Sequence, residues 1–156
     1  MTWLKTLAFT VLYPGTVCVG IPLAILWRDW GSLRPTGPWA IAGGAVAALG
    51  LAGYAVCASE FVRRGHGTPA PYDPPKDLVV SGFYRFSRNP MYVSVWSIVA
   101  GETIATRSAG MLIYAAILAL GFHLRVLLYE EPELHRLFGE SYERYRAEVP
   151  RWLGRK

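Results

Sequence analysis

Two polar, aromatic-rich blocks hold most of the residues in this chain that could do chemistry. The first is Arg88-Asn89-Pro90-Met91-Tyr92, and the second begins at Glu130-Glu131-Pro132 and continues through Tyr142, Tyr145 and Arg151. The two blocks flank a long apolar stretch. Ionisable groups at membrane depth are costly and are therefore a functional hypothesis by default. This placement predicts an enzyme that works at a lipid surface.

The elements between the blocks are predicted to be membrane helices. Residues 6–27 and 35–59 carry no charged side chain, and each stretch exceeds the roughly 20 residues that cross a bilayer as a helix. Two weaker apolar runs follow at 91–106 and 108–129. The pattern predicts an all-α, polytopic integral membrane protein with about four transmembrane helices.

The 156 residues form one predicted domain, since the chain leaves little room for a separate soluble unit. Its parts are an N-terminal helical hairpin (1–62), a cytoplasmic loop (63–90), a second hairpin (91–129) and a cytoplasmic tail (130–156). We expect the tail to complete the site that begins at Arg88.

Local sequence signals add detail to this architecture. Pro14 and Pro22 are expected to kink the first helix. The helix predicted at 38–62 is rich in glycine and alanine, which allow helix backbones to approach closely in lipid. Beyond Pro132 the pattern predicts two amphipathic helices, at 132–138 and 140–148, separated by Gly139.

The charge distribution predicts the orientation. The net charge is +5, with eleven Lys and Arg residues in the 62–90 loop and the tail against three in the opposite turns. This asymmetry follows the positive-inside rule and predicts that both termini are cytoplasmic. The excess basicity is thus a topology signal that favours anionic headgroups over nucleic acid as a partner.

Several familiar sites are excluded by the sequence. It contains no G-x-G-x-x-G, no P-loop and no G-x-S-x-G string, which argues against a Rossmann, P-loop or α/β-hydrolase site. His66, His123 and His135 do not have the spacing of a zinc site, so no metal is expected. Cys18 and Cys57 lie in apolar runs and are expected to pack as small hydrophobes.

Some polar residues near the end of the fourth apolar run have structural alternatives. His123 could form an interhelical hydrogen bond, and Arg125 could extend to the interface. Glu130-Glu131 could cap the helix that follows. Taken one at a time, these residues leave both readings open.

Taken together, the two blocks are more specific. They read GFYRFSRNPMY at 82–92, EEPEL at 130–134, FGESYERY at 138–145 and VPRW at 149–152. This set strongly resembles the isoprenylcysteine carboxyl methyltransferase family, which belongs with membrane phospholipid methyltransferases in one superfamily. The stretch GTPAP at 67–71 looks like a bacterial branch, which implies a bacterial inner-membrane protein.

The resemblance implies S-adenosyl-L-methionine as the methyl donor, bound between the last two membrane helices and the tail. The implied catalytic residues are Arg88, Glu130 and Tyr92. The implied cofactor-binding residues are Arg88, Asn89, Pro90, Tyr92, His123, Glu130, Glu131, Tyr142, Tyr145 and Arg151.

Each implied role suits the chemistry of the donor. Arg88 or Arg151 would bind its carboxylate, and Glu130 and Glu131 would accept hydrogen bonds from its ammonium and ribose hydroxyls. An aromatic face would attract its sulfonium. The expected acceptor is lipid-soluble or lipid-attached.

Two other readings remain open at this point. Membrane reductases related to the sterol reductases share a similar C-terminal architecture and bind NADPH, although Pro90 and the Glu130-Glu131 pair look more like the methyltransferases. The chain could also be a non-enzymatic membrane scaffold whose tail binds headgroups. Cofactor binding distinguishes these readings.

Overall fold

The computed structural model describes residues 2–27, 35–63 and 77–154, and these are arranged as helices without a strand. The predicted all-α class is therefore confirmed. Residues 64–76 of the predicted 63–90 loop and the turn that holds Arg28 and Arg34 lie outside the described residues. In chain order the helices are α1 (Thr2–Gly15), the π-helical turn η1 (Thr16–Gly20), α2 (Ile21–Trp27), α3 (Gly37–Arg63), the 3₁₀ turn η2 (Gly82–Arg85), α4 (Pro90–Thr106), α5 (Ala109–Arg125), the π-helical turn η3 (Val126–Glu130), α6 (Glu131–Phe138) and α7 (Glu140–Glu148).

The first helix runs unbroken through α1, η1 and α2, with its irregular turn just before Pro22. The Ile21 N–H donates to the Thr16 carbonyl, five residues back, and Pro22 has no N–H to donate. The Val17 carbonyl therefore lacks a helical donor, and the Tyr114 hydroxyl of α5 donates to it at 2.8 Å. The proline thus creates an acceptor that joins α5 to the first helix.

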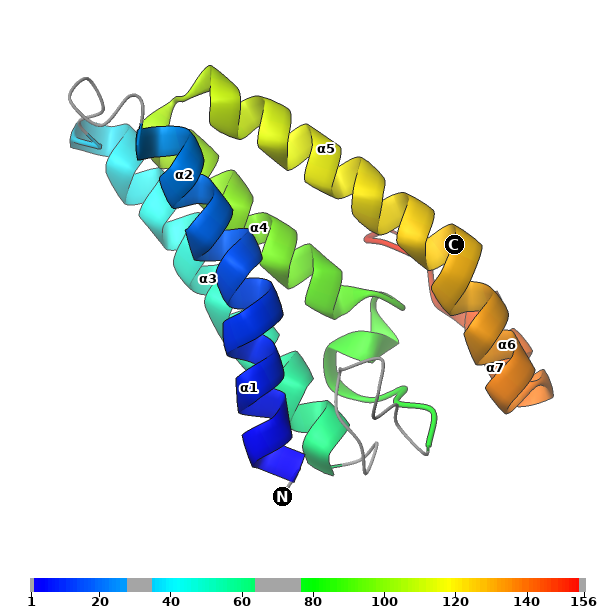
Figure 1. The fold of residues 1–156 in the computed structure, drawn as a ribbon. Helices are drawn as coiled ribbons and strands as arrows, with labels where there is room; N and C mark the ends of the chain where they lie inside the picture. Colours follow the sequence, from blue (N-terminus) through cyan, green and yellow to red (C-terminus); the bar gives the residue numbers. More distant parts are fainter. Residues whose placement is uncertain (1, 28–34, 64–76, 155–156) are drawn as a thin grey trace.

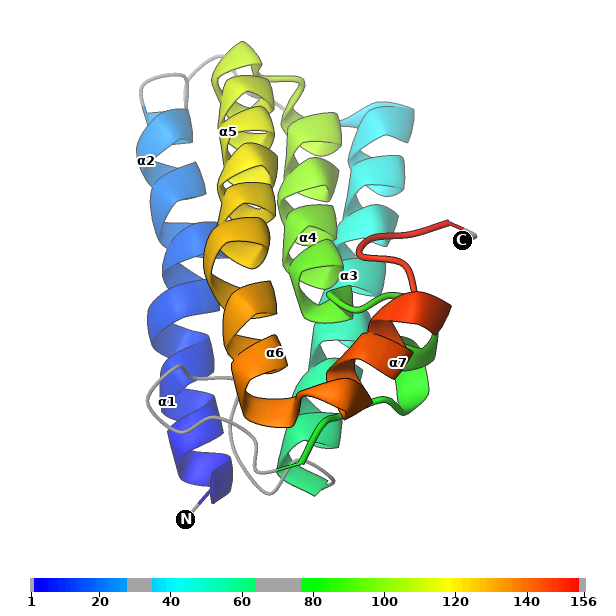
Figure 2. The same ribbon diagram turned by 90° about the vertical axis from the view of Figure 1, so that its right-hand side faces the viewer.

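The closest helix pair is α3 with α4, which lie side by side in Figure 2. A Cβ atom added at Gly43 would lie 2.4 Å from the Gly101 carbonyl oxygen, and one at Gly101 would lie 2.5 Å from the Ala47 nitrogen. Only residues without side chains permit this backbone approach. The expected role of the small residues in the second span is confirmed.

Helix α4 is shorter than the other long helices. Three helices are long and apolar enough to cross a membrane, at Leu7–Trp27, Gly37–Glu60 and Ala109–Phe138. Helix α4 has 17 residues and ends at Thr106, and the next residue, Arg107, has a φ of 54° at the turn before α5. The described residues thus support three spanning helices, and a total of about four stays a prediction.

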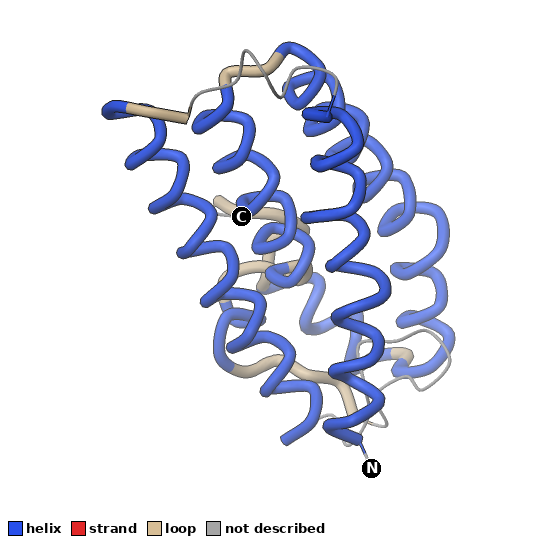
Figure 3. The backbone as a smooth tube through the Cα atoms, turned by 60° about the vertical axis from the view of Figure 1, so that its left-hand side comes forward, coloured by secondary structure: helices blue, strands red, loops and turns tan. Residues whose placement is uncertain are grey.

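The helix formed by α5, η3 and α6 carries the chain away from the bundle toward the end where α4 begins (Figure 1). Its π turn precedes Pro132, and the Glu131 N–H reaches back five residues to the Val126 carbonyl. After α7 the chain turns back, so that the C-terminal segment finishes midway along the bundle (Figures 2 and 3). The Arg88 N–H donates to the Pro150 carbonyl at 2.9 Å and holds this segment against the start of α4.

Candidate functional site

The first cluster at this end of the molecule centres on Glu131, and we call it the clamp: Arg88, Glu131, Tyr142 and Arg151. Arg151 donates from Nε and Nη2 to the two Glu131 oxygens, at 2.6 and 2.9 Å. Arg88 Nη1 lies 3.0 Å from Glu131 Oε1 and donates to the Tyr142 hydroxyl at 2.9 Å. Both carboxylate oxygens and the facing arginines are therefore satisfied within the protein.

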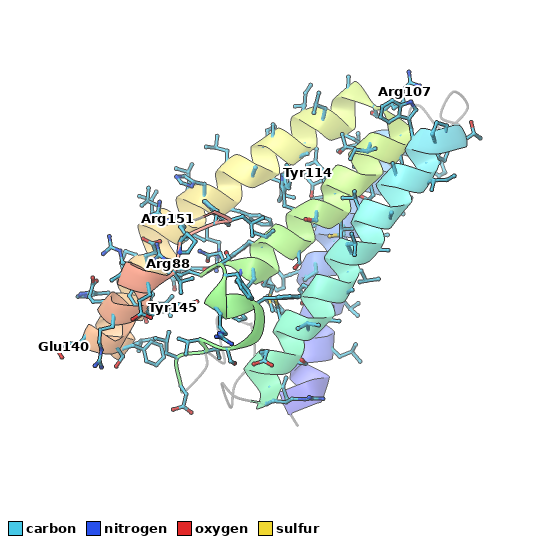
Figure 4. The ribbon with its side chains drawn as sticks, turned by 180° about the vertical axis from the view of Figure 1, so that it is seen from behind. Arg88, Arg107, Tyr114, Glu140, Tyr145 and Arg151 are labelled. Carbon is cyan, nitrogen blue, oxygen red and sulfur yellow. The ribbon has the colours of Figure 1, made fainter. Side chains whose placement is uncertain are left out.

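Backbone contacts reinforce the clamp. Arg88 Nε donates to the Val149 carbonyl at 3.1 Å. Asn89 Nδ2 and the Ser87 hydroxyl both donate to the Arg151 carbonyl, at 3.0 and 3.3 Å. The loop before α4 thus binds the C-terminal segment through its side chains as well as its backbone (Figure 4).

Three of the four clamp side chains are buried, and that of Arg151 is 27% exposed. The side chains of Arg88 and Glu131 are 6% and 10% exposed, and Tyr142 is fully buried. Burial raises the pKa of the Tyr142 phenol, while the hydrogen bond to Glu131 raises the pKa of the Arg151 guanidinium. Removal of one partner from a buried ion pair strongly destabilises the folded protein, because the other charge stays buried without its partner. The clamp therefore stabilises the contact between the start of α4 and the C-terminal segment.

The second cluster comprises Tyr92, Arg125 and Glu130, and we call it the cavity triad. The Tyr92 hydroxyl donates to Glu130 Oε1, and Arg125 Nε donates to both, at 3.0 Å to the hydroxyl and 2.9 Å to the carboxylate. The Tyr92 ring packs on Phe122 with centroids 4.6 Å apart. The Glu130 side chain remains 26% exposed and that of Arg125 44% exposed, so this cluster is accessible.

The cavity triad lines a cavity of about 550 Å³. The walls come from α1, from the segment before α4, and from α4, α5, α6 and α7. The lining residues are Phe9, Tyr13, Pro14, Val17, Tyr54, Leu78, Val79, Tyr84, Arg88, Asn89, Met91, Tyr92, Val95, Phe122, Arg125, Tyr129, Glu130, Glu133, Leu134, Leu137, Phe138 and Tyr145. A mainly apolar and aromatic wall with a few converging polar groups is typical of a small-molecule site.

The ten predicted cofactor-binding residues divide into two groups in the structure. Arg88, Asn89, Tyr92, Glu130 and Tyr145 line the cavity. The others are not among the lining residues of the cavity: Pro90, His123, Glu131, Tyr142 and Arg151. The structure therefore brings both polar blocks together at one end of the bundle but presents only part of the set to a ligand.

The residues outside the cavity have protein partners. Glu131, Tyr142 and Arg151 form the clamp with Arg88. His123 Nδ1 accepts a hydrogen bond from the Trp152 indole at 3.2 Å. Trp152 lies after α7, so this contact joins α5 to the C-terminal segment and is not the interhelical hydrogen bond given as the structural alternative for His123.

Sequence reasoning missed two parts of the cavity wall. Arg125 is left open between a functional residue and a side chain that reaches the interface, and it is not among the implied cofactor-binding residues, but it bridges Tyr92 and Glu130. Helix α1 contributes Phe9 and Tyr13, whose rings stack at 4.9 Å. The one available signal was their spacing of four residues, which places both rings on one face of a mostly aliphatic helix.

Comparisons with known proteins place the chain in a family. Residues 40–141, more than half of the chain, match the phospholipid methyltransferase family. The chain therefore belongs to that family. The Schizosaccharomyces pombe protein-S-isoprenylcysteine O-methyltransferase is 33% identical over 75 residues, which cover 47% of this chain and 31% of that protein. No solved structure matches the chain.

This membership agrees with the resemblance found in the two polar blocks. Together with the three long apolar helices, it indicates an integral membrane protein of the phospholipid methyltransferase family. The matched range ends at Ser141, before the C-terminal half of the clamp, and begins after α1.

Proposed function

We propose that this protein transfers a methyl group from S-adenosyl-L-methionine to a lipid-soluble or lipid-attached acceptor at the cytoplasmic membrane face. The observation that carries the proposal is the accessible cavity triad in a family of methyltransferases. When bound, the donor supplies a methyl carbon that is already activated by a sulfonium.

The cavity fits such a donor by size and by chemistry. Its volume of about 550 Å³ falls within the range of small-molecule sites. The Glu130 carboxylate would accept hydrogen bonds from ammonium or hydroxyl groups, and the cavity-facing guanidinium of Arg125 would bind a carboxylate. The aromatic rings of the wall suit a sulfonium cation.

The protein's main tasks in this reaction are alignment and the exclusion of water. Methyl transfer from a sulfonium is an in-line displacement, so the two reactants must be held in line and close together. The aromatic residues of α1, α4 and α5 would exclude water from the cavity. The clamp would hold Arg88 and the start of α4 in place while a ligand occupies the cavity.

The acceptor determines whether a base is needed. A carboxylate acceptor requires none at neutral pH. An amine acceptor must lose a proton, and the Glu130 carboxylate, which lines the cavity and accepts a hydrogen bond from the Tyr92 hydroxyl, would accept it. The name of the family describes a phospholipid acceptor and that of the relative an isoprenylcysteine acceptor.

Ligand binding to the purified protein in detergent tests the donor. We expect calorimetry and thermal-shift measurements to detect S-adenosylhomocysteine and to show no response to NADPH. A response to NADPH alone would support a reductase, and no response to either would favour a scaffold. Incubation of membranes with donor labelled in its methyl group, followed by identification of the labelled product, would establish the acceptor.

A further inference from the structure

A second surface feature lies on the other side of the loop that precedes α4. It is an open groove of about 440 Å³ between α3 and α4, and we call it the α3/α4 groove. Ser87 and Pro90 line this groove, whereas Arg88 and Asn89 between them line the cavity. The loop is therefore a partition between two separate sites.

The groove exists because α3 lacks side chains where it meets α4. A Cβ at Gly50 would lie 2.7 Å from the Ser94 carbonyl oxygen, and one at Gly53 would lie 2.7 Å from the Ser94 hydroxyl. The floor is thus mostly backbone, and Leu49 and Val93 form the sides. In the view of Figure 4, no described helix lies in front of α3 and α4 on this face.

The depth of the groove in the membrane and its apolar lining indicate which kind of molecule covers it. Its α3 residues all fall within the apolar span Gly37–Glu60, so in a bilayer the groove is at hydrocarbon depth. Its lining is almost entirely apolar, and Phe83, Phe86 and Leu153 close the end near the loop. An apolar channel of this form, open to the bilayer, matches a hydrocarbon chain.

Positive charge lies at the closed end. Arg85 is exposed between Phe83 and Phe86 in the η2 turn. Arg63 is exposed on the same face of α3 as the groove residue Val56, two turns closer to the end of the helix. Neither arginine has an ion-pair partner among the described residues. Cations at this level attract anionic headgroups.

We propose that the α3/α4 groove binds one acyl chain of an anionic phospholipid, whose phosphate lies beside Arg63 and Arg85. This lipid is separate from the methyl acceptor because the Ser87–Pro90 partition separates the groove from the cavity. The bound chain contacts Leu153, two residues after the Arg151 carbonyl that Ser87 and Asn89 hold. A bound lipid therefore supports the C-terminal segment from the side opposite the clamp.

Photolabelling of the full-length protein tests this site. The protein is placed in phosphatidylcholine vesicles with a trace of phosphatidylglycerol that carries a photoreactive group on one acyl chain. We expect labels on Val93 and Ser97, which line the groove. Ala52→Trp, which fills the groove, should remove most of this labelling, while Ala55→Trp, on an exposed part of α3 outside the groove, should leave it unchanged.

Charge variants test the headgroup. Arg63→Gln and Arg85→Gln should each reduce the preference for phosphatidylglycerol over an equally labelled phosphatidylcholine by about fivefold. Size-exclusion profiles and melting temperatures report whether each variant is folded. If Ala52→Trp does not fold, Ser97→Phe closes the groove from the α4 side.

Two results would overturn the proposal. One is equal labelling of Val93 and Ser97 in the folded Ala52→Trp and Ala55→Trp proteins. The other is crosslinking between two protein chains at those residues, which would show that a second copy covers this face. Both outcomes leave the methyl-transfer proposal intact, because neither measures donor binding.

Discussion

Glu130 and Glu131 are adjacent in the sequence, yet the structure gives them opposite surroundings. Both Glu131 oxygens accept bonds from arginines, and the side chain is 10% exposed. Glu130 is 26% exposed, and it lines the cavity. Both glutamates have partners within the protein, but only Glu130 also lines the cavity and can bind a ligand there. The clamp and the cavity triad should therefore respond differently to mutation.

The largest effect is expected from breaking the clamp. Arg88→Ala leaves the buried Glu131 carboxylate with one arginine fewer and should reduce the free energy of unfolding by about 3–5 kcal/mol. Unfolding of the protein in detergent, followed by circular dichroism, measures this change. The exposed Arg144→Ala is the control and should stay within about 0.5 kcal/mol of wild type. If the free energy of unfolding of Arg88→Ala equalled that of wild type, the clamp would not stabilise the fold.

Comparison of the two glutamates sharpens the distinction. Glu130→Gln should weaken S-adenosylhomocysteine binding by about 10- to 100-fold, since a hydrogen bond to a charged group contributes about 1.5–3 kcal/mol. Its unfolding should be close to that of wild type. Glu131→Gln should instead reduce the free energy of unfolding more than it reduces ligand affinity. Calorimetry and unfolding on both variants would reveal whether the roles are reversed.

A smaller effect is expected at the tyrosine of the cavity triad. Tyr92→Phe keeps the ring against Phe122 but removes the hydroxyl between Arg125 and Glu130. Loss of a hydrogen bond of about 0.5–1.5 kcal/mol predicts about a 2- to 10-fold weaker affinity for S-adenosylhomocysteine. Titration calorimetry checks this, and identical affinities would remove the hydroxyl from the site.

The smallest effect is expected where the tail meets α5. Trp152→Phe deletes the indole donor to His123 Nδ1 and should cost about 0.5–1 kcal/mol of stability with no direct effect on the cavity. Unfolding measures the loss, and ligand titration serves as the control. A large loss of affinity at full stability would place the Trp152–His123 contact within the binding site.

Local features of the fold could be predicted from the sequence because their causes are local. Long charge-free runs predict apolar helices, Pro90 marks the start of α4, and Gly139 separates α6 from α7. The convergence of the two polar blocks was predicted from the family resemblance and is seen as the 3.0 Å contact of Arg88 with Glu131.

The composition of the candidate site was harder to predict. Residue type alone does not show which side chains a cavity exposes, since arginine and glutamate occur in both clusters. Adjacent side chains of a helix point about 100° apart, so Glu130 and Glu131 face different partners, and only the packing of the tail and α4 decides which partners those are. The spacing of Phe9 and Tyr13 places both rings on one face of α1, but packing between segments far apart in the chain decides that this face lines the cavity.

The sequence by itself determined the helical class, the positions of the apolar spans and the two blocks of polar residues, because hydrophobic length, proline and glycine act over a few neighbouring residues. The tertiary structure alone decided which of those polar residues brace one another and which line a cavity. The C-terminal segment returns to the start of α4 and buries the ion pair between Arg88 and Glu131. Glu130 lines the cavity instead, where its carboxylate is available to a ligand.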